Sequence, residues 1–143
     1  MKATGISTWA GTWKKGNGFI STKSDTLQKA PVSFSSRFEG TPGASPEELL
    51  AAAHAACFNQ ALSNIAGMSK LETESIHTVV DIDLGYAAGT GVPEIKSLHF
   101  RVSAKIPTAT QAQFDDFTER ARTGCTISKI IKLETTLSGT LLG

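Results

Sequence analysis

SPEELLAAAHAACFNQALSNIAG, residues 45–67, is the longest stretch of the chain with the start and stop signals of a helix. Ser45 can cap the N-terminus, Pro46 suits the first helical position, and acidic residues follow in the first turn, where the helix dipole favours them. Gly67 is placed to end the helix. Because the stretch is rich in alanine and has few charges, we expect a central, largely buried helix.

Short strands are expected before this helix. ISTWAGTW (6–13) and GFISTK (18–23) flank the turn KKGNG, whose glycines and asparagine suit a hairpin. In PVSFSSRFEG (31–40) apolar and polar residues alternate, which predicts a third strand. In such a strand Arg37 lies on the face opposite the phenylalanines.

The remainder of the chain alternates between strand and helix patterns. Two strands are expected at 76–86 and 94–107, and the second has an unbroken apolar face. A helix over 108–124, which starts near Thr108 or Thr110, a short helical turn at 125–131 and a last strand at 133–143 follow. The strands and helices do not follow a strict β-α-β order along the chain, so we expect an α+β fold. We expect one domain, which spans residues 1–143.

Composition excludes several classes of function. The chain has 143 residues, a net charge of +1 and 19% charged residues. This composition has no excess of basic residues of the kind that binds nucleic acid or an anionic membrane. No run is long enough to span a bilayer, and no signal-peptide pattern opens the chain. Two cysteines without a secretory signal indicate a reducing compartment, so we expect a cytoplasmic protein.

The two thiols, Cys57 and Cys125, leave three interpretations open. A metal site could combine Cys57 with His54, three residues earlier on the same helix face, but a structural zinc needs four ligands. Only Cys125 and two histidines in strand patterns, His77 and His99, could join them, and no metal motif is present. We therefore expect no bound metal.

Packed, inert thiols are common, and chemically active thiols are the remaining interpretation. Cys125 opens a helical turn, where backbone N–H groups can stabilise a thiolate. Cys57 lies in the middle of a helix and would need a cation from elsewhere. The spacing of the two cysteines cannot show whether the fold joins them.

Three motifs, SSRFEG (35–40), SPEELLAAAHAACF (45–58) and GCTISK (124–129), together resemble the OsmC (osmotically inducible protein C) family, relatives of the organic hydroperoxide resistance proteins. The resemblance runs over essentially the whole chain. It implies a cysteine-based peroxidase for organic hydroperoxides, and less readily hydrogen peroxide, in oxidative and osmotic stress defence. It also implies antiparallel sheets packed around a long central helix, in an intertwined homodimer.

The resemblance assigns roles to four residues. Cys57 matches the peroxidatic cysteine, Cys125 the resolving cysteine, Arg37 the activating arginine, and Glu47 the carboxylate that orients it. Ten residues of helix place Glu47 about 15 Å from Cys57 along the axis. We therefore expect Glu47 to come from the partner subunit of a two-fold dimer.

The implied reaction needs no bound cofactor. Cys57 is oxidised to a sulfenic acid, Cys125 condenses with it to a disulfide, and an external dithiol such as a lipoyl group reopens the bridge. Thr126 stands where the family often has proline, which leaves the stiffness of the resolving loop open. A non-catalytic dimeric module for small apolar ligands and a thiol redox sensor are the alternatives. Thiol loss on adding an alkyl hydroperoxide separates a peroxidase from the binding module, whereas a redox sensor would oxidise but turn over poorly.

Overall fold

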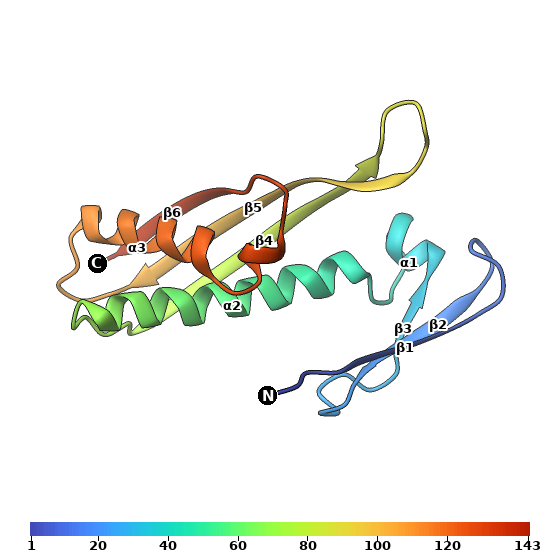
Figure 1. Cartoon of the computed structure of the whole chain (residues 1–143), viewed down its shortest axis with the longest axis horizontal. Coiled ribbons are helices and arrows are strands. Elements are labelled where there is room, and N and C mark those ends of the chain that lie inside the picture. Colours follow the sequence, from blue (N-terminus) through green and yellow to red (C-terminus); the bar gives the residue numbers. More distant parts are fainter. The chain divides into compact units, whose positions relative to one another are not determined.

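Three antiparallel strands, β1 (Gly5–Ala10), β2 (Asn17–Thr22) and β3 (Ala30–Ser33), open the chain and form a sheet in that order (Figure 1). The computed structural model describes residues 1–143 and separates them into two units, Met1–Leu49 and Leu50–Gly143. The expected hairpin is confirmed by the register, in which Ala10 pairs with Asn17.

The expected third strand is wrong beyond its first half, because a one-turn helix, α1 (Phe34–Phe38), replaces it. Ser33 caps this helix, and the side chains of Ser33 and Ser36 bond each other's backbone N–H. The two phenylalanines of α1 are four residues apart and both pack edge-on against Trp13. The alternation that predicted a strand also places these rings one helical turn apart.

The long helix, α2 (Pro46–Met68), begins as the sequence predicts, since the Glu48 backbone N–H donates to Ser45 Oγ at 3.1 Å. Its end differs from the prediction. Gly67 stays helical, and Lys70 adopts the left-handed conformation with φ 58°. The N–H groups of Lys70 and Leu71 then donate to the carbonyls of Gly67 and Ala66. This is a Schellman ending built on a lysine.

The second sheet has the order β4 (Ser75–Tyr86), β5 (Pro93–Lys105), β6 (Thr136–Leu142). β4 and β5 are antiparallel, but β6 runs parallel to β5, so the expectation of purely antiparallel sheets is wrong at this strand. The helix α3 (Gln111–Gly124) and the 3₁₀ turn η1 (Ser128–Ile130) lie between β5 and β6. They return the chain along the sheet, as a parallel connection requires.

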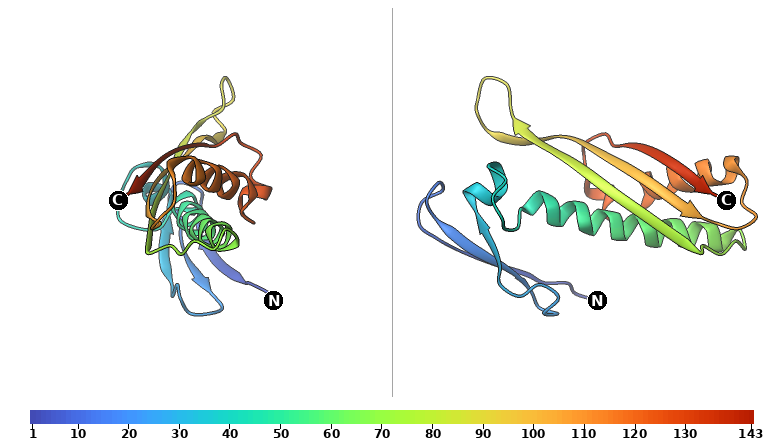
Figure 2. Two further views of the ribbon diagram at one scale, coloured as in Figure 1. Left: turned by 90° about the vertical axis from the view of Figure 1, so that its left-hand side faces the viewer. Right: turned by 180° about the vertical axis from the view of Figure 1, so that it is seen from behind.

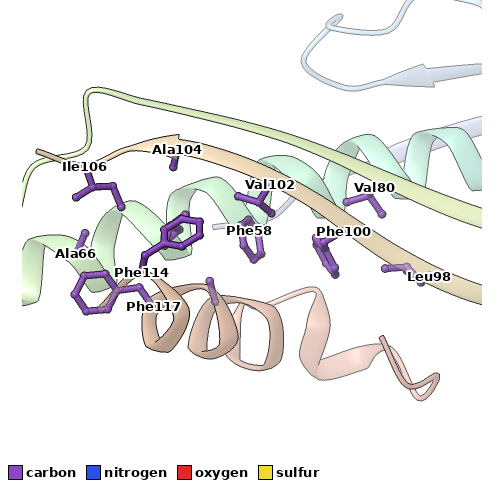
Figure 3. Packing of buried hydrophobic residues seen from close by; sticks show 12 residues of the cluster. Phe58, Ala66, Val80, Leu98, Phe100, Val102, Ala104, Ile106, Phe114 and Phe117 are labelled. Atoms are coloured by element: carbon purple, nitrogen blue, oxygen red, sulfur yellow. The ribbon is translucent and has the colours of Figure 1, made fainter. Parts of the chain in front are cut away.

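Both α2 and α3 cover the same face of this sheet, in front of it in Figure 1 and behind it in the reverse view of Figure 2. Figure 3 shows the apolar side chains that fill the space between the helices and β5. Gly139 of β6 lets the Phe114 ring approach closely, since a Cβ there would lie 2.8 Å from it. The buried core consists of Phe58, Leu62, Ala66, Val80, Leu98, Phe100, Val102, Ala104, Ile106, Phe114, Phe117 and Ala121.

The first unit contributes no residue to this core. Its large apolar side chains stand exposed: Trp9 is 44% and Phe19 45% accessible. Phe19 pairs with Thr8, one position before Trp9, so the two rings lie on opposite faces of the sheet. The small sheet is therefore apolar on both sides and needs cover on both. None of the helices is long and apolar enough to cross a bilayer.

We expect Lys70→Gly to stabilise the protein by about 0.5–1 kcal/mol, because glycine adopts the left-handed conformation without steric cost. Gly67→Ala should give a similar gain, since a Cβ at this helical position meets nothing within 4 Å. Urea unfolding of both variants checks this. A loss of stability in Lys70→Gly would contradict the Schellman ending.

Candidate active site

Arg37 is held by a carboxylate from the start of α2. Its Nε donates to both carboxylate oxygens of Glu47, at 3.2 and 3.1 Å, and its Nη2 donates to Oε1 at 2.6 Å. The Glu47 side chain is 12% exposed and that of Arg37 33%. The Nη1 edge of the guanidinium takes no part in this pair, so one edge of the fork remains available to an anion.

Glu47 and Arg37 pair within one chain, so Glu47 orients the arginine of its own subunit. That this pair belongs to the partner of the chain that supplies Cys57 stays a prediction. The separation that suggested it was measured between Glu47 and Cys57, whereas Glu47 contacts α1. The segment between α1 and α2 is folded back, with Ser36 Oγ donating to the carbonyl of Ala44 at 3.0 Å. This fold brings Arg37 to the first turn of α2.

The ring of Phe38 supports the guanidinium from a second direction, with Arg37 Cζ 5.0 Å from the ring centroid. A strand would have separated these neighbours onto opposite faces, as the sequence predicted. In the helical turn they lie side by side, where a cation over an aromatic face is stabilised. Arg37 is thus oriented by one carboxylate and one ring.

The two thiols both lie in the second unit and are both free. Cys57 is half-buried in the middle of α2, and Cys125, which caps the C-terminus of α3, is only 3% exposed. The backbone N–H of Ser128 donates to Cys125 Sγ at 3.4 Å, and the Ser128 hydroxyl lies 3.0 Å from the same sulfur. The expectation that N–H groups of the turn face Cys125 is confirmed.

His54 links this turn to α2. Its Nε2 lies 2.7 Å from Ser128 Oγ, and its ring packs edge-on against Phe100. The side chain is fully buried, and its Nδ1 has no hydrogen-bond partner. Burial lowers the pKa of His54 below 6.5, so the ring is neutral at neutral pH. Cys125 is therefore connected, through Ser128, to the helical turn that precedes Cys57.

His54 and Ser128 were not recognised as a pair from the sequence, which offered His54 only as a metal ligand. The sequence did hold a signal for the burial of His54, because His54, Phe58 and Leu62 recur every four residues and mark one buried face of α2. The structure holds no group of three or more His, Cys, Asp or Glu side chains arranged for a metal ion. His99 faces away from the core and contacts Ser138 on β6.

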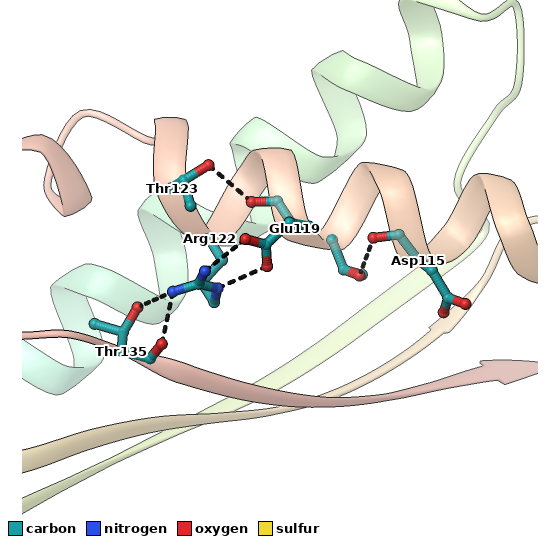
Figure 4. A network of polar contacts seen from close by, with 6 residues as sticks. Asp115, Glu119, Arg122, Thr123 and Thr135 are labelled. Carbon is teal, nitrogen blue, oxygen red and sulfur yellow. Dashed lines mark hydrogen bonds and ion pairs between the residues drawn. The ribbon is translucent and has the colours of Figure 1, made fainter.

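An ion-pair network fixes the other end of the Cys125 segment (Figure 4). Arg122 of α3 donates from Nη1 to the carbonyl and hydroxyl oxygens of Thr135, at 2.6 and 2.7 Å. Its Nε and Nη2 bond the carboxylate of Glu119, which lowers the pKa of that carboxyl. Thr126 is exposed and takes no part. The turn is thus held by hydrogen bonds at both ends without a proline.

Comparison with known proteins places this chain in a family. The model of the family described as "OsmC-like protein" matches residues 38–138 of this chain. Peroxiredoxin OsmC of Escherichia coli (strain K12) is 38% identical over 134 residues, which cover 93% of this chain and 92% of that protein. The chain therefore belongs to the OsmC-like family, as the motifs predicted. Glu47 and both cysteines lie inside the matched range, and Arg37 directly precedes it.

Solved structures agree on the fold. The OsmC-like protein from Mycoplasma pneumoniae has a TM-score of 0.76 at 11% identity, covering 100% of this chain and 99% of that one. The organic hydroperoxide resistance protein OhrB of Bacillus subtilis has a TM-score of 0.72 at 21% identity, covering 97% and 98%. At such identities the likeness concerns the fold alone, and it confirms the predicted α+β class.

Stability should fall as the pH drops below 6.5, because His54 binds its proton more weakly in the folded chain than in the unfolded one. In that window the unfolded state carries more protons, so acidification favours it. His54→Gln should remove this part of the pH dependence. Urea unfolding on either side of pH 6.5 checks it. The other histidines are present in both proteins, so an equal slope in the variant would contradict the assignment.

Proposed function

We propose that this chain is a thiol-dependent peroxidase that reduces organic hydroperoxides, and hydrogen peroxide less well, in defence against oxidative and osmotic stress. One observation carries the proposal: hydrogen bonds tie the second thiol to the turn of α2 that precedes the first. Membership of a family whose curated relative in Escherichia coli is named a peroxiredoxin supports it.

The two thiols have different tasks in this proposal. The half-buried Cys57 thiolate attacks one peroxide oxygen, breaks the O–O bond, and becomes a sulfenic acid, while the other oxygen leaves as an alcohol. The Cys125 thiol then displaces the sulfenic oxygen as water and forms the Cys57–Cys125 disulfide. An external dithiol, for example a lipoyl group, reduces the bridge by exchange. No bound cofactor or metal takes part.

Arg37 would contribute to the reaction in a second way besides stabilising the Cys57 thiolate. An ordinary cysteine is a few per cent thiolate at neutral pH, so complete ionisation would gain at most about thirty-fold, or about 2 kcal/mol. The accompanying loss of basicity makes the thiolate a weaker nucleophile and cancels part of that gain. The free Nη1 edge of Arg37 would therefore bind the peroxide and stabilise the charge on the leaving oxygen.

The proposed active unit is an intertwined homodimer of single-domain chains. The exposed apolar rings on both faces of the first sheet support it, because an isolated chain leaves them in water. The exposed side of α2 carries small residues, Ala52, Ala53 and Ala56, which allow another backbone to approach closely. In this dimer the Arg37–Glu47 pair of one chain lies beside Cys57 of the other and stabilises its thiolate.

An organic hydroperoxide suits this helix better than a small polar peroxide. Leu50, Ala53 and Ala61 surround the position of Cys57 on α2 with apolar surface, which would hold a hydrocarbon substituent. The proposed location is the cytoplasm, where reducing conditions keep both thiols ready.

Cys57→Ser should abolish peroxide consumption, whereas Cys125→Ser should react once and then stall as a sulfenic acid or over-oxidise. Peroxide consumption with a dithiol donor, and the mass of the intact protein after one equivalent of hydroperoxide, check this. Normal turnover by Cys125→Ser would contradict the resolving role. Unchanged thiols in the wild type after peroxide treatment would reject the peroxidase and favour a binding module.

Mixing inactive Cys57→Ser and Arg37→Ala chains should restore about one quarter of wild-type activity, since half the dimers are mixed and each has one intact site of two. Subunit exchange is verified by mass spectrometry. The matched control mixes Arg37→Ala with Glu47→Ala. Since these two residues pair within one chain, no mixed dimer there has a complete Arg37–Glu47 pair beside Cys57, and activity should stay absent. Failure of the first mixture despite exchange would mean that each site is built within one chain.

A further inference from the structure

A continuous line of hydrogen-bonding groups leads away from the Cys125 sulfur into the core. Cys125 Sγ lies 3.0 Å from Ser128 Oγ, and Ser128 Oγ lies 2.7 Å from His54 Nε2. A thiol, a hydroxyl and an imidazole in this order can pass a proton along the line. The peroxidase chemistry described above assigns no task to either Ser128 or His54.

We propose that Ser128 and His54 form a proton relay that activates the Cys125 thiol for disulfide formation. The inference rests on the proposed function for its biological purpose. Ser128 touches the reacting sulfur and is a catalytic residue in this scheme. His54 acts through Ser128 and is a positioning residue that also holds the proton.

The step balances without any further reactant. The Cys125 thiol gives its proton to Ser128 Oγ while the Ser128 hydroxyl proton moves to His54 Nε2. The resulting thiolate attacks the Cys57 sulfur, the S–S bond forms, and the S–O bond of the sulfenic acid breaks. The oxygen leaves as hydroxide and takes up a proton from solvent to become water, and His54 releases the relayed proton to solvent and returns to its neutral form. No net charge is created.

The surroundings of His54 suit a neutral ring that accepts a proton only briefly. The ring packs against Phe100 of β5 and bonds Ser128 of η1, and Cys125 lies beyond the serine. Burial is the one cause that lowers the pKa of His54, and no charged group contributes. The backbone N–H of Ser128 remains directed at the sulfur at 3.4 Å, so it can stabilise the thiolate after the proton has left.

A purely structural role explains this histidine poorly. The buried face of α2 is otherwise apolar, with Phe58, Leu62 and Ala66 at the following four-residue steps. A leucine at position 54 would continue that face, whereas His54 leaves Nδ1 buried without a partner. An unpaired buried polar atom costs about 1–3 kcal/mol. Asn59 Oδ1 and Thr78 Oγ1 are also buried without a partner, so the line from Cys125 Sγ through Ser128 Oγ to His54 Nε2, and not this cost, carries the relay.

The test separates Cys125 attack from peroxide chemistry. One equivalent of the aromatic disulfide dithiobis-nitrobenzoate, added to the full chain, forms a mixed disulfide on the more exposed Cys57 and releases one coloured thiolate. Attack by Cys125 then releases a second. Because this leaving group needs no proton, the second release measures the deprotonation and attack of Cys125 alone.

Four variants decide between relay and scaffold. Ser128→Ala removes the hydroxyl, Ser128→Thr keeps it, and His54→Gln keeps a hydrogen-bonding group but cannot take a proton. We expect Ser128→Ala and His54→Gln to slow the second release about 10²-fold near neutral pH, with recovery at alkaline pH, where hydroxide removes the thiol proton directly. Ser128→Thr should rescue most of the rate. His99→Gln is the matched control, because His99 contacts Ser138 with no thiol beside it.

A wild-type second release in His54→Gln or Ser128→Ala overturns the relay. So does a slow release that alkaline pH does not restore, since that indicates lost structure. Circular dichroism confirms folding, and the two Ser128 variants suffice if His54→Gln fails to fold, since Ser128 lies in a half-exposed turn. A relay that passes this test in a chain that forms no sulfenic acid with alkyl hydroperoxide would reject the peroxidase function and leave the relay intact.

Discussion

The packing of α2 against β5 is the constraint on which the second unit depends. The same helical face that buries Phe58 and Leu62 against Phe100 also buries His54, and His54 in turn bonds the turn after α3. Apolar burial of side chains of this size contributes about 1.5–3 kcal/mol each, far more than one hydrogen bond. The proposed thiol chemistry would therefore take place on a helix that core packing already holds in place.

The first unit has the opposite character. It contains Arg37, the proposed cation of the site, which Glu47 and Phe38 hold in position, but it has no buried apolar core of its own. A sheet of three short strands with aromatic rings on both faces is unlike a sheet that is solvated on one side. The proposed dimer would satisfy both features together, because it would cover the sheet and place the Arg37 guanidinium of one chain beside Cys57 of the other.

Polar groups in the second unit are distributed according to their task. On the outer face of the sheet, Arg101 bonds Asp81 and His99 bonds serine and threonine hydroxyls, all in contact with water, where such pairs contribute little to stability. On the inner face, the buried polar side chains are His54 and Thr118. Thr118 donates to the Phe114 carbonyl within its own helix, whereas His54 bonds the Ser128 hydroxyl, which lies beside the Cys125 thiol. This asymmetry is the physical basis for assigning His54 to the chemistry rather than to the scaffold.

Local patterns in the sequence were sufficient for much of the fold and for the family. The cap at Ser45, the apolar face of β5 and the start of α3 after Thr110 all depend on neighbours within a few residues, and the structure confirms each of them. Three short motifs likewise identified the OsmC-like family. The four proposed site residues came from those motifs, and their roles remain predictions.

Other features depend on contacts between segments far apart in the chain. Phe34 and Phe38 fit a strand or a helix equally well until Trp13 packs against both, and the parallel pairing of β6 follows from the return path through α3. His54 and Ser128 are 74 residues apart, so no local pattern could join them. Glu47 and Arg37 pair within one chain because the segment between them folds back, which helix spacing alone does not reveal. Sequence periodicity and capping residues reflect interactions between near neighbours in the chain. The hydrogen-bond partner of a buried polar group depends instead on which distant segments the folded core brings together.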